Sequence, residues 1–143
     1  NDFDDSILVR RNESTGKACT FQLDANVYQN KTYQPPELCY SGQDLDEKID
    51  IYALGGILYG ILTRARPYND LRGNYTEIKR RKQVGIMPTF AKIEGRQDIA
   101  SGALRKAIEQ CLRPNPKSRP SARQIARDLE NAYKSASKEA EEQ

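Results

Sequence analysis

The most apolar stretch of the chain runs from about residue 46 to residue 63. Ile51, Tyr52 and Ala53 add to its hydrophobic surface, so the predicted helix is apolar around nearly its whole circumference and must be wrapped by other elements. The uncharged run 51–63 is too short to span about 30 Å of hydrocarbon, which argues against a membrane helix. The pattern therefore predicts a central buried helix over about 46–63. Its large side chains recur at helical spacing: Ile49, Leu54, Ile57, Leu58, Ile61 and Leu62.

The segment before this helix has the pattern of short strands and loops. Residues 7–9 are β-prone, residues 12–16 are turn formers, and residues 19–23 alternate apolar with polar, which predicts a β-hairpin. Residues 24–36 are rich in Asn, Gln and Tyr and end in two prolines, which predicts an extended loop. One helical turn is expected at 37–40.

The segment after it predicts three further helices. One covers 75–84 and is closed by Gly85, and the next runs from Asp98 or Ser101 to about residue 112. Ser121 with Gln124 has the spacing of a capping box, and the helix that it starts turns Ile125, Leu129 and Tyr133 inward. Residues 134–143 are charged and are expected to fray. The fold class is thus mainly α, with a short β-hairpin or extended segment at the N-terminus.

Composition narrows the class of protein further. The chain has 143 residues, enough for one domain or part of one, and its net charge of +3 selects no partner by itself. Its three cysteines form no Cys-x-x-Cys pair and it has no histidine, which argues against a zinc site and favours reduced thiols in the cytoplasm. The chain begins with Asn1 and shows no signal peptide, so we expect a piece of a longer protein.

Asp50 is the first candidate functional residue. It lies in the first turns of the predicted buried helix, where a carboxylate needs a polar partner. The alternative is a carboxylate favoured by the helix dipole at an N-terminus.

Four short segments carry motif-like residues, and their order along the chain is informative. They are Tyr33-Gln34-Pro35-Pro36-Glu37, Asp50-Ile51-Tyr52-Ala53-Leu54-Gly55, Arg66-Pro67-Tyr68 with Gly85-Ile86-Met87-Pro88, and Cys111-Leu112-Arg113-Pro114-Asn115-Pro116-Lys117-Ser118-Arg119-Pro120. Together they resemble the C-terminal lobe of a eukaryotic protein kinase. The first is similar to the Ala-Pro-Glu motif, the second to Asp-x-Trp-Ser-x-Gly, and the last to Cys-x-x-x-x-Pro-x-x-Arg-Pro. Pro35, Tyr52 and Ala53 depart from the usual small residue, Trp and Ser.

The resemblance implies roles for three structural organisers. The family's carboxylate in the position of Asp50 accepts hydrogen bonds from the catalytic-loop backbone. The Glu in the position of Glu37 pairs with the Arg in the position of Arg119 and pins the end of the activation segment to the lobe. No catalytic residue is expected within this chain.

The N-terminus resembles the metal-binding turn of the family. Asp2-Phe3-Asp4 stands where kinases carry Asp-Phe-Gly, which implies that Asp2 and Phe3 belong to the ATP site and that Asp2 binds its Mg²⁺. Asp4 in place of Gly is a departure, because glycine adopts backbone angles that Asp reaches less easily. The alternative is a plain acidic N-terminus.

Residues 5–36 would be the activation segment. Ser14, Thr15, Thr20 and Thr32 are hydroxyls whose phosphorylation could order it, although loops are generally rich in such residues. Asn30 stands where Ser/Thr kinases usually carry Thr, which leaves the substrate class open.

The resulting hypothesis is a partial protein kinase domain over 1–134 with a charged tail over 135–143. The parent protein would transfer the γ-phosphoryl group of Mg-ATP to protein Ser/Thr hydroxyls, in preference to Tyr, in the cytoplasm and without a membrane segment here. The Gly-rich loop, its Lys and Glu partners and the His-Arg-Asp loop are expected upstream, so this chain alone should be inactive. The hypothesis requires Glu37 to lie near Arg119 and the helix that contains Ile57 to be buried.

Two alternatives remain open. A pseudokinase or scaffold module with the same fold is favoured by Asp4 and Asn30. A basic helical nucleic-acid-binding domain is suggested by the run at 79–82, although such a run is more often a solvated helix face, and we expect no nucleic-acid partner.

Overall fold

Four α-helices and four short 3₁₀ turns make up the regular structure of the described part of the chain. The structure, a computed structural model, describes residues 6–23, 32–40 and 42–142. The helices are α1 (Lys48–Thr63), α2 (Tyr75–Val84), α3 (Ile99–Cys111) and α4 (Ala122–Glu141), and the turns are Pro36–Cys39, Asn69–Leu71, Ala91–Ile93 and Pro116–Ser118. The fold is mainly helical, as predicted.

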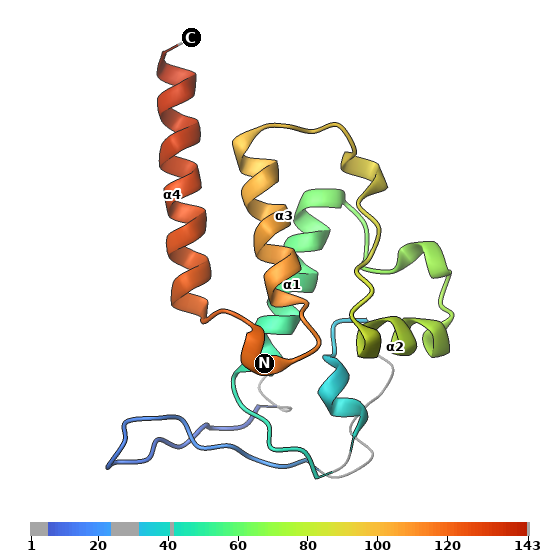
Figure 1. The fold of residues 1–143 in the computed structure, drawn as a ribbon, viewed down its shortest axis with the longest axis vertical. Helices are drawn as coiled ribbons and strands as arrows, with labels where there is room; N and C mark the ends of the chain where they lie inside the picture. The colour runs from blue at the N-terminus through green and yellow to red at the C-terminus, as the bar shows by residue number, and fades with distance from the viewer. Residues whose placement is uncertain (1–5, 24–31, 41, 143) are drawn as a thin grey trace.

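The hydrophobic core lies between α1, α3 and α4. Helix α1 packs against α3 and α3 packs against α4, while α2 lies to the other side beside the 3₁₀ turn at 36–39 (Figure 1). A Cβ on Gly55 would come within 2.7 Å of the Cys111 Cβ, so the glycine allows α1 and α3 to approach closely. The core side chains are Ile51, Tyr52, Leu58, Tyr59, Leu62, Ile93, Ala107, Ile108, Cys111, Leu112 and Ile125.

Helix α1 is buried on one face only. Ile51, Leu58 and Leu62 are buried, but Ile57 is 55% exposed and Ile61 is 63% exposed. The expectation of burial around the whole helix, Ile57 included, is therefore wrong for the described part of the chain. The physical reason is that α3 covers one side of α1, and no described element covers the side that carries Ile57 and Ile61.

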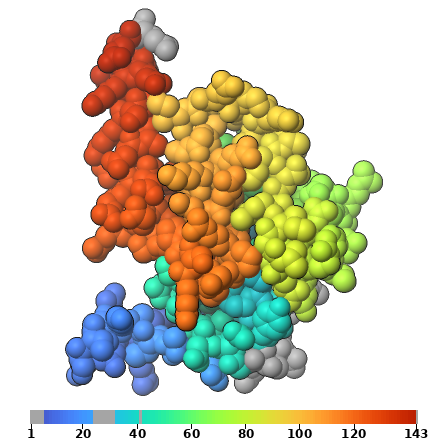
Figure 2. Space-filling view, in the orientation of Figure 1, coloured from blue at the N-terminus to red at the C-terminus, as the bar shows by residue number. Residues whose placement is uncertain are grey.

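The N-terminal segment turns back on itself without forming strands. A single antiparallel bridge joins Arg11 to Ala18, and no ladder extends it within residues 6–23. The Asn12 carboxamide oxygen accepts hydrogen bonds from the backbone N–H groups of Ser14 and Thr15, both at 3.0 Å, so the turn satisfies its own polar groups. Two strands were expected here, and the structure has only a hairpin-like turn, which projects from the helical body (Figure 2).

The bounds of α2 and α3 follow their capping residues. The Asn74 side chain accepts from the N–H of Glu77 at 3.1 Å, and Gly85 ends α2 at φ 77°, an angle that glycine adopts without strain. The Asp98 carboxylate accepts from the N–H of Ser101 at 2.8 Å and so begins α3. Both helices were predicted, with Gly85 as the end of α2 and Asp98 as one of two possible starts of α3, whereas the capping role of Asn74 was not foreseen.

Helix α4 departs from the prediction at both ends. The Ser121 hydroxyl accepts from the N–H of Gln124 at 3.2 Å, but the Gln124 side-chain oxygen accepts from Arg127 at 2.9 Å instead of from the Ser121 N–H, so only half of the capping box forms. Ile125 is buried as expected, whereas Tyr133 is 72% exposed and not inward-facing.

The charged C-terminal residues continue α4 and do not fray. The helix runs unbroken to Glu141, and Lys134 pairs with Glu130 one turn earlier at 2.7 Å, a spacing that stabilises exposed helices. Among the helices that the structure describes, none has the length and apolar character needed to cross a bilayer.

Candidate functional site

A buried carboxylate–guanidinium pair joins two of the motif segments. Arg119 donates to Glu37 through both terminal nitrogens, at 2.6 Å from Nη1 to Oε1 and 2.8 Å from Nη2 to Oε2. The Arg119 side chain is fully buried and that of Glu37 is 8% exposed. This bidentate geometry is the strongest arrangement that a guanidinium makes with a carboxylate. The pair implied by the kinase resemblance is thus present, 82 residues apart in sequence.

Backbone carbonyls complete the surroundings of Arg119. Its Nε donates to the carbonyl of Arg113 at 2.8 Å, Nη1 to that of Lys48 at 2.8 Å, and Nη2 to that of Pro114 at 3.1 Å. Lys48 also donates to this segment: its Nζ forms hydrogen bonds with the carbonyls of Arg119 and Pro120, each at 2.9 Å. With the two bonds to Glu37, the five hydrogen bonds of the guanidinium match its five N–H donors, as a buried charge requires.

Tyr52 lies beside this pair at the centre of the site. The Arg119 Cζ is 4.9 Å from the centroid of the Tyr52 ring, and the Lys82 Nζ is 5.8 Å from the same centroid. Both cations are within the range of cation–π attraction. Burial raises the pKa of the Tyr52 hydroxyl well above its ordinary value, so the phenol stays neutral. Its hydroxyl makes no hydrogen bond within the described residues.

Lys82 is the unexpected member of the site. Its side chain is 1% exposed, and its Nζ donates to the carbonyl of Gln34 at 2.8 Å. The expectation of a solvated basic face at 79–82 is therefore wrong for this residue. No pattern in the sequence distinguishes Lys82 from its neighbours, because lysines in amphipathic helices are exposed by default.

Burial lowers the pKa of Lys82 to about 8. Because this pKa is below that of a lysine in an unfolded chain, the unfolded state binds the proton more tightly. The burial of the charge destabilises the fold below about pH 8. This destabilisation is relieved as the pH rises from about 8 toward about 10.4, the ordinary lysine pKa.

The two arginines of α2 do not form a free basic patch. Arg80 and Arg81 pair with Glu77 at 2.7 Å and 3.0 Å, and Arg81 also approaches Asp70 at 3.5 Å. Hydrogen bonds from Arg80 and then Arg81 lower the pKa of Glu77 to about 2. Local carboxylates thus neutralise the charges that the nucleic-acid alternative would need.

Asp50 is exposed, which contradicts its expected burial. It lies in the first turn of α1, on the stripe that leads to Ile57 and Ile61. Because no described segment covers that stripe, the carboxylate stays in water, where the helix N-terminus favours it. The structure therefore brings Glu37 and Arg119 together and leaves Asp50 apart from them.

The residues assigned to the cofactor lie outside the described part of the chain. These are Asp2 and Phe3, and the departures at Asp4 and Asn30 lie outside it as well. Among the described residues, no group of three or more His, Cys, Asp and Glu side chains could hold a metal ion. The metal role of Asp2 remains a prediction.

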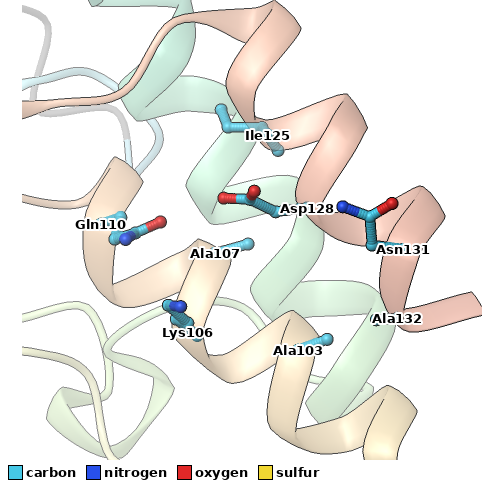
Figure 3. A pocket seen from close by; sticks show the side chains of 8 residues that line it. All are labelled: Ala103, Lys106, Ala107, Gln110, Ile125, Asp128, Asn131 and Ala132. Atoms are coloured by element: carbon cyan, nitrogen blue, oxygen red, sulfur yellow. The ribbon is translucent and has the colours of Figure 1, made fainter. Parts of the chain in front are cut away.

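A groove of about 240 Å³ separates α3 from α4 (Figure 3). Asp128 of α4 points toward α3 across it, and three alanines from the two helices are among the lining residues. None of its lining residues belongs to the four motif segments: they are Ala103, Lys106, Ala107, Gln110, Ile125, Asp128, Asn131 and Ala132.

The chain belongs to the protein kinase domain family, whose family model matches residues 2–129. Among curated proteins it is 27% identical over 140 residues to a mitogen-activated protein kinase kinase kinase 7-like protein of Drosophila melanogaster, a match that covers 94% of this chain and 35% of that protein.

Two further relatives are protein kinases of yeasts. An Aurora kinase of Schizosaccharomyces pombe is 31% identical over 96 residues, with 66% of this chain and 24% of that protein covered. The serine/threonine-protein kinase KIC1 of Saccharomyces cerevisiae is 32% identical over 121 residues, with 78% and 11% covered. The chain thus spans about a third or less of the length of the curated relatives it matches.

Proposed function

We propose that this chain is the C-lobe portion of an ATP-dependent protein kinase that phosphorylates Ser and Thr hydroxyls of proteins. The observation that carries the proposal is the buried Glu37–Arg119 pair. It ties the 3₁₀ turn at 36–39 to the segment before α4, as expected for the end of an activation segment held on a kinase lobe. Relatives named as serine/threonine-protein kinases, KIC1 among them, support the choice of hydroxyl.

The described residues would organise the reaction and take no chemical part in it. Phosphoryl transfer depends mainly on positioning and charge neutralisation, so a rigid platform beneath the activation segment is a functional component. Mg²⁺ bound with ATP would supply that neutralisation, and Asp2 is the residue we assign to it. We propose that residues upstream of this chain supply the catalytic base and most of the ATP site. We also propose that the kinase domain covers 1–134 of this chain and that the parent protein is cytoplasmic.

A pseudokinase with the same fold is the second candidate. It is favoured by Asp4 where the family has Gly and by Asn30 where the family has Thr. Such a protein would keep the Glu37–Arg119 platform and use it to hold a partner protein.

The test is phosphate transfer from radiolabelled Mg-ATP to casein by the full-length protein, beside an Asp2→Ala variant. We expect transfer by the first and none by the second, with unchanged thermal unfolding. A well-folded full-length protein without transfer overturns the kinase proposal and favours the pseudokinase. Transfer that persists in Asp2→Ala overturns the metal role of Asp2 alone.

A further inference from the structure

The segment 33–37, which leads into the 3₁₀ turn and forms its first half, is held from three directions. Tyr33 packs against Gly56, where a Cβ would come within 2.5 Å of the Tyr33 ring. Glu37 is held by Arg119 at the other end of the segment. Between them, the carbonyl of Gln34 accepts from Lys82 of α2 at 2.8 Å. Each contact comes from a different element of the lobe.

The two prolines of this segment make the contact between Lys82 and the Gln34 carbonyl important. Pro35 and Pro36 follow Gln34, and neither has a backbone N–H, so this stretch can be held through its carbonyls but donates nothing. Both prolines are buried. A cation directed at the preceding carbonyl is therefore one of few polar means of fixing the path by which the chain enters the turn.

The position of Lys82 also has a local disadvantage for stability. An ammonium that is 1% exposed is desolvated, and a methionine of similar length would fill the same space without that penalty. The aliphatic stem alone does not require a charged end. The presence of an amine here is explained if the contact with Gln34 serves the reaction more than the stability of the fold.

We propose that Lys82 is a positioning residue for the protein substrate, because it holds the Gln34 carbonyl and so fixes the segment 32–37 on α1 and α2. The inference rests on the kinase function proposed above, in which this segment closes the substrate-facing loop. Lys82 touches neither ATP nor the reacting atoms in this assignment. Its loss should therefore weaken the use of protein substrate and spare the use of ATP.

The experiment compares three variants of the full-length protein with casein as substrate. Lys82→Met removes the donor at similar length, and Lys82→Arg keeps a cationic donor. Arg80→Met is the matched control, since it removes the same charge from the same helix at a side chain that is 56% exposed. The readouts are kcat, the KM for casein, the KM for ATP and the thermal midpoint.

Loss of one charge-assisted hydrogen bond predicts a rise of about tenfold in the casein KM for Lys82→Met. We expect kcat and the ATP KM to stay within about twofold, with Lys82→Arg recovering most of the loss and Arg80→Met unchanged. If Lys82→Met does not fold, Lys82→Gln, which keeps an N–H donor on a shorter arm, replaces it and should raise the same KM.

The failures of the two proposals can be told apart. A wild-type protein without transfer overturns the kinase function and the substrate role together. An active wild type in which Lys82→Met matches Arg80→Met in casein KM overturns the Lys82 proposal alone. A fall in kcat that follows the thermal midpoint, with both KM values unchanged, shows a purely structural lysine and also overturns it.

Discussion

Removal of Arg119 is the perturbation with the largest expected effect on this fold. An Arg119→Met substitution leaves the Glu37 carboxylate, 8% exposed, without its counter-charge. It also removes the donor from three backbone carbonyls, those of Arg113, Lys48 and Pro114. Breaking a buried pair by removing one partner costs about 3–5 kcal/mol, against a total stability of about 5–15 kcal/mol for a domain.

The Glu37→Gln substitution should cost less. Its amide oxygen still accepts from Arg119, and the guanidinium keeps its three carbonyl acceptors. We expect about 1–3 kcal/mol. The double variant Glu37→Gln/Arg119→Met should cost less than the sum of the two single variants, because a neutral amide without its partner is less unfavourable than a stranded carboxylate.

The assay is urea unfolding of the full-length protein, followed by far-UV circular dichroism. Lys134→Met is the control, since the pair of Lys134 with Glu130 is exposed on both sides and should contribute less than about 1 kcal/mol. The reasoning is refuted if Arg119→Met costs no more than Lys134→Met. It is also refuted if the sum of the two single-variant costs lies within about 0.5 kcal/mol of the double-variant cost, which would mean that the residues are not coupled.

Three further predictions concern other positions in the full-length protein. Gly55→Ala should lower the free energy of unfolding by about 1–3 kcal/mol through the clash with α3, whereas Gly102→Ala, with open space around it, should be neutral or stabilising; equal urea midpoints would contradict this. The stability of the wild type should rise relative to Lys82→Met between about pH 8 and 10, because the buried lysine loses its unfavourable charge there, and a difference that does not change with pH would exclude the lowered pKa. Ile57→Asp should destabilise the protein by more than about 2 kcal/mol if upstream residues cover this face, while Tyr133→Asp should stay within about 0.5 kcal/mol; equal effects would leave Ile57 in water.

Local signals predicted the helices well because each signal acts within a few residues. The end of α2 depends on Gly85 and the start of α3 depends on Asp98, and both residues were recognised as helix signals in the sequence. The Glu37–Arg119 contact could be predicted only through the resemblance, since nothing local relates residues that far apart.

Burial was harder to predict than secondary structure. Hydrophobic spacing identified α1, but it could not say which face a neighbour covers, so Ile57 and Ile61 were misplaced. The predicted burial of Tyr133 was wrong for the same reason, because α4 continues as a helix whether or not its apolar positions contact another element. The prediction for Lys82 erred in the opposite sense: a lysine is expected to be exposed, but tertiary packing buries this one.

Tyr52 explains why motifs spread over the chain converge on one place. Its ring lies near Arg119 from the last motif and near Lys82, which holds the first motif through Gln34. A planar ring can receive a cation at each of these positions without a hydrogen bond of its own, and an aliphatic side chain cannot. The residue on α1 thus couples two charged contacts that fix the same short segment. Since both cations are buried, a smaller side chain at this position would disturb the Gln34 and Glu37 contacts together, which ties the order of the activation segment to the packing of α1.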